Sequence, residues 1–142
     1  MATTYGTEMT KLRNTTPPEK PDAGAVSGKL RVFSETFTMA AQAAGDIIEL
    51  ARLPKGARVL FGVLNASATL GAAATLAIGI AGNTGKYRAA AVHTTADAPV
   101  LFGVNAGMGV KLAAEEIVIG TVAVAALPGA GNVNVMMVYT IE

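Results

Sequence analysis

Two long stretches of this 142-residue chain carry no charged side chain, and the pattern inside them decides the fold class. They cover residues 59–85 and 117–141. Each is longer than the roughly 20 apolar residues that cross a membrane as a helix. However, five glycines interrupt the first stretch, and the turn-like sequence Pro128–Asn132 interrupts the second. Because glycine and proline mark turns rather than helix interiors, the sequence predicts no spanning helix and no membrane partner.

Apolar side chains in both stretches recur at every second residue. Leu76, Ile78 and Ile80 alternate with small or polar residues, and a similar alternation runs from Val133 to Ile141. A period of two is typical of a β-strand with one buried face. Strands therefore explain the uncharged stretches better than helices do.

Turn signals divide the chain into about eight short strands. The expected strands are residues 30–39, 46–53, 58–65, 75–81, 86–92, 100–104, 117–127 and 133–141. In the third expected strand, Val59, Phe61 and Val63 should lie on the same side. The links 40–45 and 111–116 are each long enough to form a single helical turn. This pattern predicts an all-β single domain over residues 29–142, either a jelly-roll-like β-sandwich or a small barrel.

Residues 1–28 differ from that body and are expected to form an extended N-terminal arm. Pro17, Pro18 and Pro21 remove backbone donors and favour extended conformations in the residues before them. The segment has few large apolar side chains, so it cannot fold alone and either moves freely or lies along another surface. It also lacks the apolar region of a secretory signal, so we expect no such signal.

Charge is unevenly distributed along the chain. Residues 1–35 hold nine of the 21 charged side chains, and the remaining 107 residues hold twelve. Twelve charges cannot cover a folded body of this size, so alanine, glycine, threonine, valine and leucine must form much of its surface. Surface of that kind is usually covered by another protein. We therefore expect self-association as a homodimer or homotrimer, or burial against a partner.

The composition excludes several classes of chemistry. The chain has no cysteine and one histidine, which excludes thiolate catalysis and cysteine-based metal sites. Its formal net charge of +1 argues against a nucleic-acid partner. The segment Gly79–Lys86 resembles a phosphate-binding loop, but Ile80 stands where that motif needs glycine and Tyr87 where it needs serine or threonine. A hairpin turn over residues 82–85 explains these glycines better.

The remaining acid–base residues lack the partners that catalysis needs. His93 follows an expected strand and is interpreted as a loop histidine rather than a general base. Glu115 and Glu116 would point to opposite faces of a strand, so they are interpreted as solvated residues rather than a carboxylate pair. The sequence therefore predicts that the protein is not an enzyme and has no catalytic, cofactor-binding or metal-binding residues.

Because the composition excludes these kinds of chemistry, we expect the protein to act by binding a partner. An extended segment needs polar anchors and apolar contacts when it binds another protein. The candidate arm residues are Tyr5, Lys11, Leu12, Arg13, Pro17, Pro18 and Lys20. A second group, Arg52, Lys55 and Arg58, surrounds the turn at Pro54 and forms either a basic patch for an acidic partner or a solvated turn, which we favour.

Several segments resemble small proteins that many tailed phages encode beside their major capsid protein. The segments are Tyr5–Glu8, Gly28–Phe33, Gly45–Ile48, Leu53–Leu60 and Val133–Tyr139. The resemblance covers the first 60 residues and the last ten, and residues 65–109 match only in their alanine, glycine and threonine content. It implies a capsid decoration, cement or stapling subunit that is made in the host cytoplasm. Such a subunit binds the major capsid protein on the exterior of the phage head, at a two-fold or three-fold axis.

Two other roles stay open. Another virion component of similar build, such as a head fibre base or a tail-tube protein, would have a similar composition. A carbohydrate-binding β-sandwich is disfavoured, because sugar-binding platforms usually need exposed aromatic rings and the chain has only four phenylalanines and three tyrosines.

Overall fold

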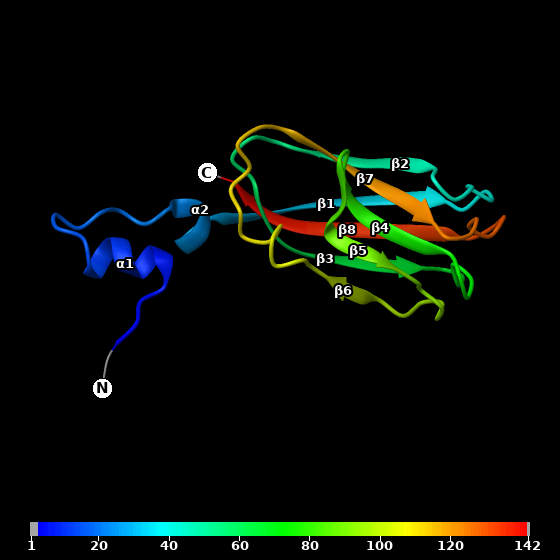
Figure 1. Cartoon of the computed structure of the whole chain (residues 1–142), viewed down its shortest axis with the longest axis horizontal. Helices are drawn as coiled ribbons and strands as arrows, with labels where there is room; N and C mark the ends of the chain where they lie inside the picture. The colour runs from blue at the N-terminus through cyan, green and yellow to red at the C-terminus, as the bar shows by residue number, and fades with distance from the viewer. Residues whose placement is uncertain (1–2, 142) are drawn as a thin grey trace.

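The computed structural model describes residues 3–141, which form two four-stranded antiparallel sheets preceded by two short helices (Figure 1). The helices are α1 (Thr7–Arg13) and α2 (Ala23–Val26). The strands are β1 (Lys29–Thr38), β2 (Ile47–Leu53), β3 (Arg58–Ala66), β4 (Thr75–Ile80), β5 (Asn83–Ala91), β6 (Val100–Phe102), β7 (Glu116–Ala123) and β8 (Asn132–Ile141). The prediction of an all-β body with about eight strands is confirmed.

The order of the strands identifies a jelly roll. Sheet A has the order β1-β8-β3-β6, and sheet B has the order β2-β7-β4-β5. The pairs β1–β8, β2–β7, β3–β6 and β4–β5 are antiparallel, so the first half of the body pairs with the second half as one long ribbon. Folding that ribbon over itself adds the pairs β3–β8 and β4–β7 and completes the two sheets of the sandwich.

The inward side chains of both sheets form one hydrophobic core. Its fully buried members include Leu64, Leu76, Ile78, Val118, Val122, Val133, Val135 and Met137. Burying one such side chain stabilises the folded state by about 1.5–3 kcal/mol relative to leaving it exposed. The members from β4 and β8 are those whose alternation is visible in the sequence.

Strand β3 departs from the predicted alternation. A β-bulge between Val59 and Phe61 shifts its register against β8. Val59 is therefore buried, whereas Phe61 lies on the outer face with 39% of its surface exposed. Gly62 takes the next inward position, where an added Cβ would lie 2.1 Å from the ring of Phe102. The prediction that Val59, Phe61 and Val63 share one side was wrong, because a bulge inverts the alternation after it.

The links between strands also differ from the prediction. Strand β5 begins at Asn83, inside the predicted turn, because the corner needs only Gly82 at a positive φ of 82°. The link 40–45 forms no helical turn, since Ala41 has a φ of 56° and its N–H donates to the Pro128 carbonyl at 3.0 Å. The link 111–116 forms none either, and Lys111 instead makes a β-bridge with Arg58.

The arm is not extended throughout, because residues 7–13 form the helix α1. This segment contains no glycine or proline, and its charges suit a helix, with Glu8 in the first turn and Lys11 and Arg13 in the last. The three prolines follow the helix and therefore do not interrupt it. The chain then folds back, and the N–H of Glu19 donates to the Lys11 carbonyl at 2.9 Å. The prediction of extended structure was wrong for residues 7–13 and for residues 23–26, which form α2.

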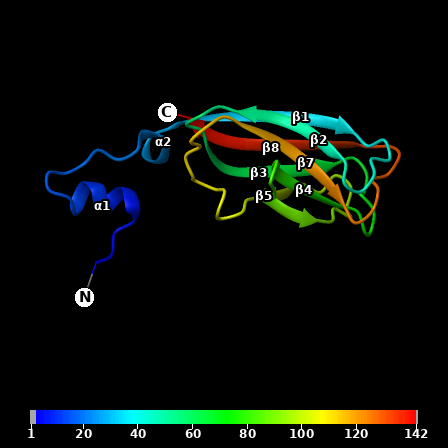
Figure 2. The ribbon, with the colours of Figure 1, turned by 45° about the horizontal axis from the view of Figure 1, so that its top comes forward.

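The arm projects from one end of the sandwich, at which β1 begins and β8 ends (Figure 1). A view turned by 45° shows the same separation of α1 from both sheets (Figure 2). We call this the arm end. The loops 39–46, 67–74, 92–99 and 124–131 lie at the opposite end, which we call the far end (Figure 1). Among residues 3–141, neither helix has the length and apolar character that crossing a membrane requires.

Candidate functional site

The arm is fixed to the body at its base, around α2. Asp22 caps α2 by accepting a hydrogen bond from the Gly24 N–H at 2.9 Å, and its second carboxylate oxygen pairs with the Arg58 guanidinium. Arg58 also donates to the Gly109 carbonyl at 2.7 Å. The Thr140 hydroxyl donates to the carbonyl of the buried Gly24 at 2.8 Å. Together these bonds hold α2 against the end of β8.

A close backbone approach completes this junction. An added Cβ at Gly28 would lie 2.9 Å from the Gly24 carbonyl oxygen and 2.9 Å from the Thr140 Cβ. Any side chain at position 28 would therefore push α2 away from β8. The glycine allows the arm to leave the body in one defined direction.

Hydrogen bonds keep two carboxylates of the arm ionised. The Glu8 carboxylate accepts from the Asp22 N–H at 2.7 Å and from the Lys11 ammonium at 2.9 Å, and these bonds lower the pKa of Glu8. The hydrogen bond from Arg58 is the main cause of a lowered pKa of Asp22. At neutral pH, a hydrogen bond to an ionised carboxylate therefore connects α1 with the N-cap of α2, and an ion pair connects that N-cap with the body.

Beyond these contacts, the arm presents apolar and basic side chains to its surroundings. Tyr5, Met9 and Leu12 are exposed, and Met9 and Leu12 share one face of α1 because they are three residues apart. Arg13 and Lys20 are exposed, and neither forms an ion pair with another residue in the range 3–141. The other predicted arm residues, Pro17 and Pro18, are exposed as well. Of the predicted arm residues, Lys11 alone is engaged in a salt bridge among the described residues, with Glu8.

The three basic residues around Pro54 do not form one patch. Arg58 faces Asp22, and its side chain is only 14% exposed, so it anchors the arm. The sequence did not indicate that role. Arg52 lies 3.6 Å from Glu115, and both side chains are largely exposed. Lys55 is exposed at the turn, so partner binding by Arg52 and Lys55 stays a prediction.

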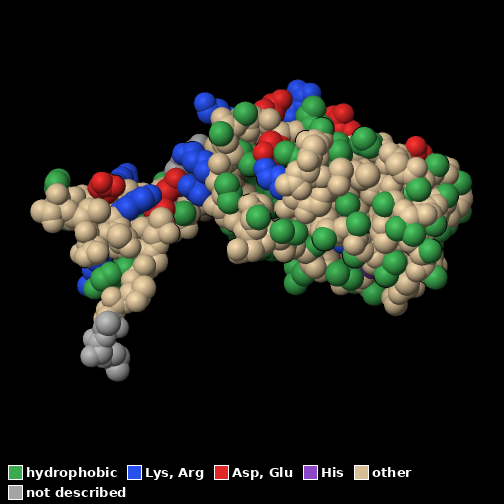
Figure 3. Space-filling view, viewed as in Figure 1, with side chains coloured by type: hydrophobic (Ala, Val, Ile, Leu, Met, Phe, Trp, Pro, Cys, Tyr) green, Lys and Arg blue, Asp and Glu red, His purple; other side chains and the backbone are tan. Residues whose placement is uncertain are grey.

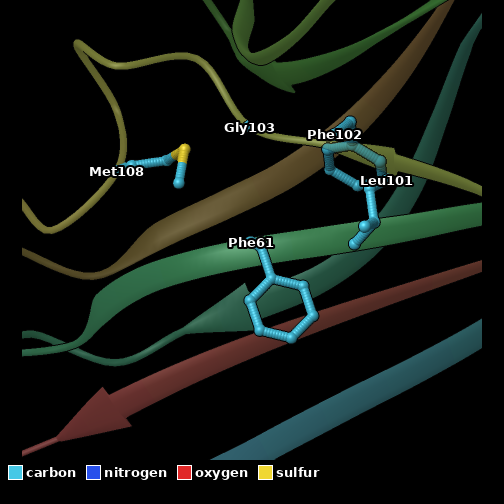
Figure 4. Close-up of a pocket in the computed structure, with 5 residues that line it drawn as sticks. All are labelled: Phe61, Leu101, Phe102, Gly103 and Met108. Carbon is cyan, nitrogen blue, oxygen red and sulfur yellow. The ribbon is translucent and has the colours of Figure 1, made fainter.

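Sheet A has an apolar outer face. One row of facing side chains crosses three strands and consists of Val32, Val138 and Phe61. A second row consists of Met136, Val63 and Leu101. An open hollow of about 440 Å³ lies beside these rows and is lined by Phe61, Leu101, Phe102, Gly103 and Met108 (Figure 4). Its lining suits an apolar side chain of another molecule rather than a charged ligand.

A loop and a glycine shape this hollow. Met108 reaches back toward Gly103 from the loop that follows β6 (Figure 4). An added Cβ at Gly103 would lie 2.2 Å from the Met108 sulfur, so only glycine leaves room for that contact. Sequence reasoning missed the hollow, because it depends on the bulge before Phe61 and on this loop, which leave no local signal.

The sequence did contain a signal for Asp22, since aspartate before Ala23–Val26 is a typical helix N-cap.

Charged side chains lie over the arm, over its junction with the body and along the upper edge of the body, whereas much of the remaining visible face of the body has none (Figure 3). The far-end loops contain only two charged residues, Asp46 and Asp97. Val124, which follows β7 at this end, is 75% exposed. The predicted apolar surface is therefore confirmed, whereas the self-association inferred from it stays a prediction.

His93 lies in a loop, as predicted, but it is buried, with 3% of its surface exposed. Its neighbour Arg88 is also buried and donates to main-chain carbonyls, among them Ala91 at 3.2 Å. Burial, together with the charge of Arg88, lowers the pKa of His93. Within residues 3–141, no group of three histidine, cysteine or acidic residues is placed to hold a metal ion.

Glu116 is also more buried than predicted. Its carboxylate accepts from the Tyr87 hydroxyl at 2.7 Å and pairs with the Lys86 ammonium, and its side chain is mostly covered. Burial and the neighbouring carboxylate raise the pKa of Tyr87. Glu115 lies apart and faces Arg52. The two glutamates do not share a site, but Glu116 is a packed member of β7 rather than a solvated residue.

Comparison with known proteins gives structural matches. No protein-family model matches the chain, and no curated protein matches it. A chain of the cyanophage Pam1 capsid asymmetric unit aligns with a TM-score of 0.68 and 24% identity, over 82% of this chain and 88% of that chain. A chain of the capsid of Ralstonia phage GP4 aligns with a TM-score of 0.66 and 26% identity, over 81% of this chain and 86% of that chain.

A third match comes from the acidic stable capsid structure of Helicobacter pylori bacteriophage KHP30. It has a TM-score of 0.60 and 12% identity, over 79% of this chain and 87% of that chain. The matched structures are structural assemblies, which favours the predicted non-enzymatic role. The matches also support a structural role in a virion. The resemblance predicted from the sequence is confirmed: the chain has the fold of proteins found in phage capsids and is similar to phage capsid-associated proteins.

Proposed function

We propose that this protein is a capsid decoration or cement subunit. It binds the exterior of a phage head after synthesis in the host cytoplasm, and it holds neighbouring copies of the major capsid protein together. The similarity to chains of phage capsids supports the virion role. The projecting arm supports the more specific role, since a subunit that joins neighbours needs two separate contact regions.

The observation that carries the proposal is the position of α1. This helix lies away from both sheets (Figures 1 and 2), although the base of the arm is fixed to the body through Asp22 and Arg58. A helix of seven residues is too short to be stable in water by itself. The exposed side chains of Met9 and Leu12 gain no burial from the protein's own body. A groove on another protein would bury that face and stabilise the helix.

The charges of the arm suit the same role. Arg13 and Lys20 are exposed, so they would meet acidic groups on the capsid protein. Because the base fixes where the arm leaves the body, the arm and the body would contact different places on the lattice. The second contact then becomes intramolecular, and two modest affinities give strong attachment.

Binding to capsids that lack this protein tests the role of the arm. The variant Tyr5→Ser/Met9→Ser/Leu12→Ser should bind at least about tenfold more weakly in co-sedimentation, because it loses the apolar contacts of the arm. Its melting temperature should match the wild type, since these side chains lie outside the core. The control Glu19→Gln changes an exposed polar residue of the same arm and should bind as the wild type does.

Two results would reject the proposal in different ways. Full binding by the arm variant would show that the arm is not the attachment region. Electron microscopy of labelled particles gives the position on the virion. Label on the tail, or on a fibre that leaves the head, would replace the decoration role with a tail-tube or fibre-base role.

A further inference from the structure

The four edge strands of the sandwich differ in how they are protected. An edge strand presents unpaired backbone groups and pairs with other chains unless something prevents it. The edge strand β6 has only three residues. The register of β2 shifts between Glu49 and Ala51, and that of β5 shifts at two places. In contrast, β1 pairs from Lys29 to Thr38 in unbroken register and contains no proline, so its outer edge is flat and open.

Hydrogen bonds show which backbone groups of β1 face the open side. Directly after the strand, the N–H of Met39 donates to the Gly131 carbonyl at 2.7 Å, so odd-numbered residues face β8. The N–H of Thr36 instead donates to the Glu35 carboxylate at 3.1 Å, and the Thr38 carbonyl accepts from the side-chain amide of Gln42 in the next loop. Even-numbered residues of β1 therefore direct their N–H and C=O groups away from the sheet.

The side chains of β1 are complementary to a second copy of the same strand. Arg31 and Glu35 are exposed, and neither forms an ion pair with another residue that the structure describes. If a second β1 lies antiparallel with Phe33 opposite Phe33, each Arg31 faces the Glu35 of the other copy. The same register sets Leu30 opposite Thr36 and Val32 opposite Ser34. Opposite charges on facing residues stabilise antiparallel pairs.

A neighbouring register would be less favourable. Sliding the two strands by two residues sets Lys29 against Glu35, but it aligns fewer residues and leaves Arg31 opposite Phe33. The register centred on Phe33 uses nearly the whole strand. It also covers Leu30 and Val32, which are 67% and 53% exposed in the single chain.

We propose that two copies of this protein associate through β1 around a two-fold axis and form one continuous eight-stranded sheet from both copies of sheet A. When a strand pairs with the same strand of a second copy, the contact is isologous, and the assembly is complete with two copies. The inference therefore selects a dimer over a trimer. It concerns the free protein and goes beyond the proposed capsid role, so a failure to bind capsids would leave it standing.

Charge exchange tests this interface without touching the core. In sedimentation equilibrium the wild type should be a dimer, and Arg31→Glu and Glu35→Arg should each weaken dimerisation by about tenfold or more, because each sets like charges opposite one another twice. The double variant Arg31→Glu/Glu35→Arg restores both ion pairs and should recover dimerisation. Lys29→Glu makes the same charge change two residues away and should have little effect.

Several outcomes would overturn the proposal. The wild type could stay monomeric at high concentration or form a trimer. The single variants could dimerise as strongly as the wild type, or the double variant could fail to recover dimerisation. Loss of the dimer in Lys29→Glu alone would assign the shifted register and reject the one proposed.

A disulfide gives an independent test, because the described chain has no native cysteine to confuse the result. Phe33→Cys places the two sulfurs at the two-fold axis, in a non-hydrogen-bonded pair whose Cα atoms are about 4.5 Å apart. It should form a covalent dimer under mild oxidation. Thr38→Cys, an exposed control on the same strand, lies far from the axis and should not. Equal cross-linking of the two variants, or none in Phe33→Cys, would contradict the geometry.

Discussion

The arm end and the far end of the sandwich are held together by different interactions. At the arm end, charged and polar side chains make the connection, and Asp22 with Arg58 is its centre. At the far end, the loops are joined mainly by backbone hydrogen bonds such as Met39 N–H to Gly131 carbonyl at 2.7 Å, and almost no charge is present. The far end therefore depends on burial and backbone geometry, and the arm end depends on ionisation.

A protein that attaches to a lattice needs a stable body and a contact region, and the two ends of this protein differ in the interactions that would serve these two needs. Backbone bonds and apolar packing respond little to salt, so the stability of the far end should change little with salt concentration. Ion pairs respond to pH and salt, so acid or high salt should weaken the junction at the base of the arm before it unfolds the body. Substitutions at one end, with the other end as the comparison, test this difference.

The largest expected effect comes from removing core volume at the far end. Leu70 lies in a far-end loop and is fully buried, so Leu70→Ala should lower the free energy of unfolding by about 2–5 kcal/mol. Leu12→Ala removes the same atoms from the exposed face of α1 and should change it by less than about 0.5 kcal/mol. Urea unfolding of both variants measures the difference. Similar losses would mean that the arm belongs to the cooperative unit of the body.

The second largest expected effect is a dependence of stability on pH that arises at the far end. The folded state holds His93 with a lowered pKa, so the unfolded chain takes up this proton at higher pH than the folded protein does. Stability should be constant above about pH 7 and should fall as pH drops below about 6.5, by at most about 1.4 kcal/mol per pH unit.

The variant His93→Gln isolates this contribution. It should lack the loss of stability between about pH 6.5 and pH 5, a range above the titration of ordinary carboxyl groups. Urea unfolding at several pH values measures it for both proteins. Equal slopes in the two proteins would show that His93 does not prefer its neutral form in the folded state.

The arm end should respond to acid in a lower pH range. The lowered pKa of Asp22 means that its bond to Arg58 is fully present above about pH 3.8 and is lost as pH falls through the lower folded-state value. Asp22→Asn should produce the same loosening at neutral pH. Hydrogen exchange should become faster at residues 23–26 and stay unchanged in β4 and β7. Glu19→Gln, an exposed charge change on the same arm, should leave both regions as they are.

The sequence predicted the body well because its signals are local. The alternation at 76–80 and 133–141 is a property of single strands, and it places the core side chains without knowledge of their neighbours. The same reasoning failed at Phe61, where the bulge against β8 is a property of two strands. The burial of the loop residue His93 also has no local signal, since the packing of distant segments covers that position.

The candidate site was harder to predict than the fold. The exposed arm residues could be chosen from composition, because an isolated apolar residue in a polar segment has no core to join. Arg58 could not be assigned correctly, since its partner Asp22 is 36 residues away and no local pattern connects the two. The hollow beside Phe61 likewise requires β3, β6 and the loop at Met108 to meet in space.

The smallest expected effect on stability comes from Arg52, and it distinguishes this residue from Arg58 on the other side of the Pro54 turn. Arg52 and Glu115 are 63% and 55% exposed at a distance of 3.6 Å, so Arg52→Ala should lower the free energy of unfolding by less than about 1 kcal/mol. The loss should shrink further in 0.5 M salt, because screening weakens an exposed pair, to within about 0.2 kcal/mol of the wild type. Hydrogen exchange at residues 23–26 should not change, since Arg52 does not contact α2. Faster exchange there would mean that the whole basic turn supports the arm, and that the division between Arg52 as a solvated residue and Arg58 as the anchor is incorrect.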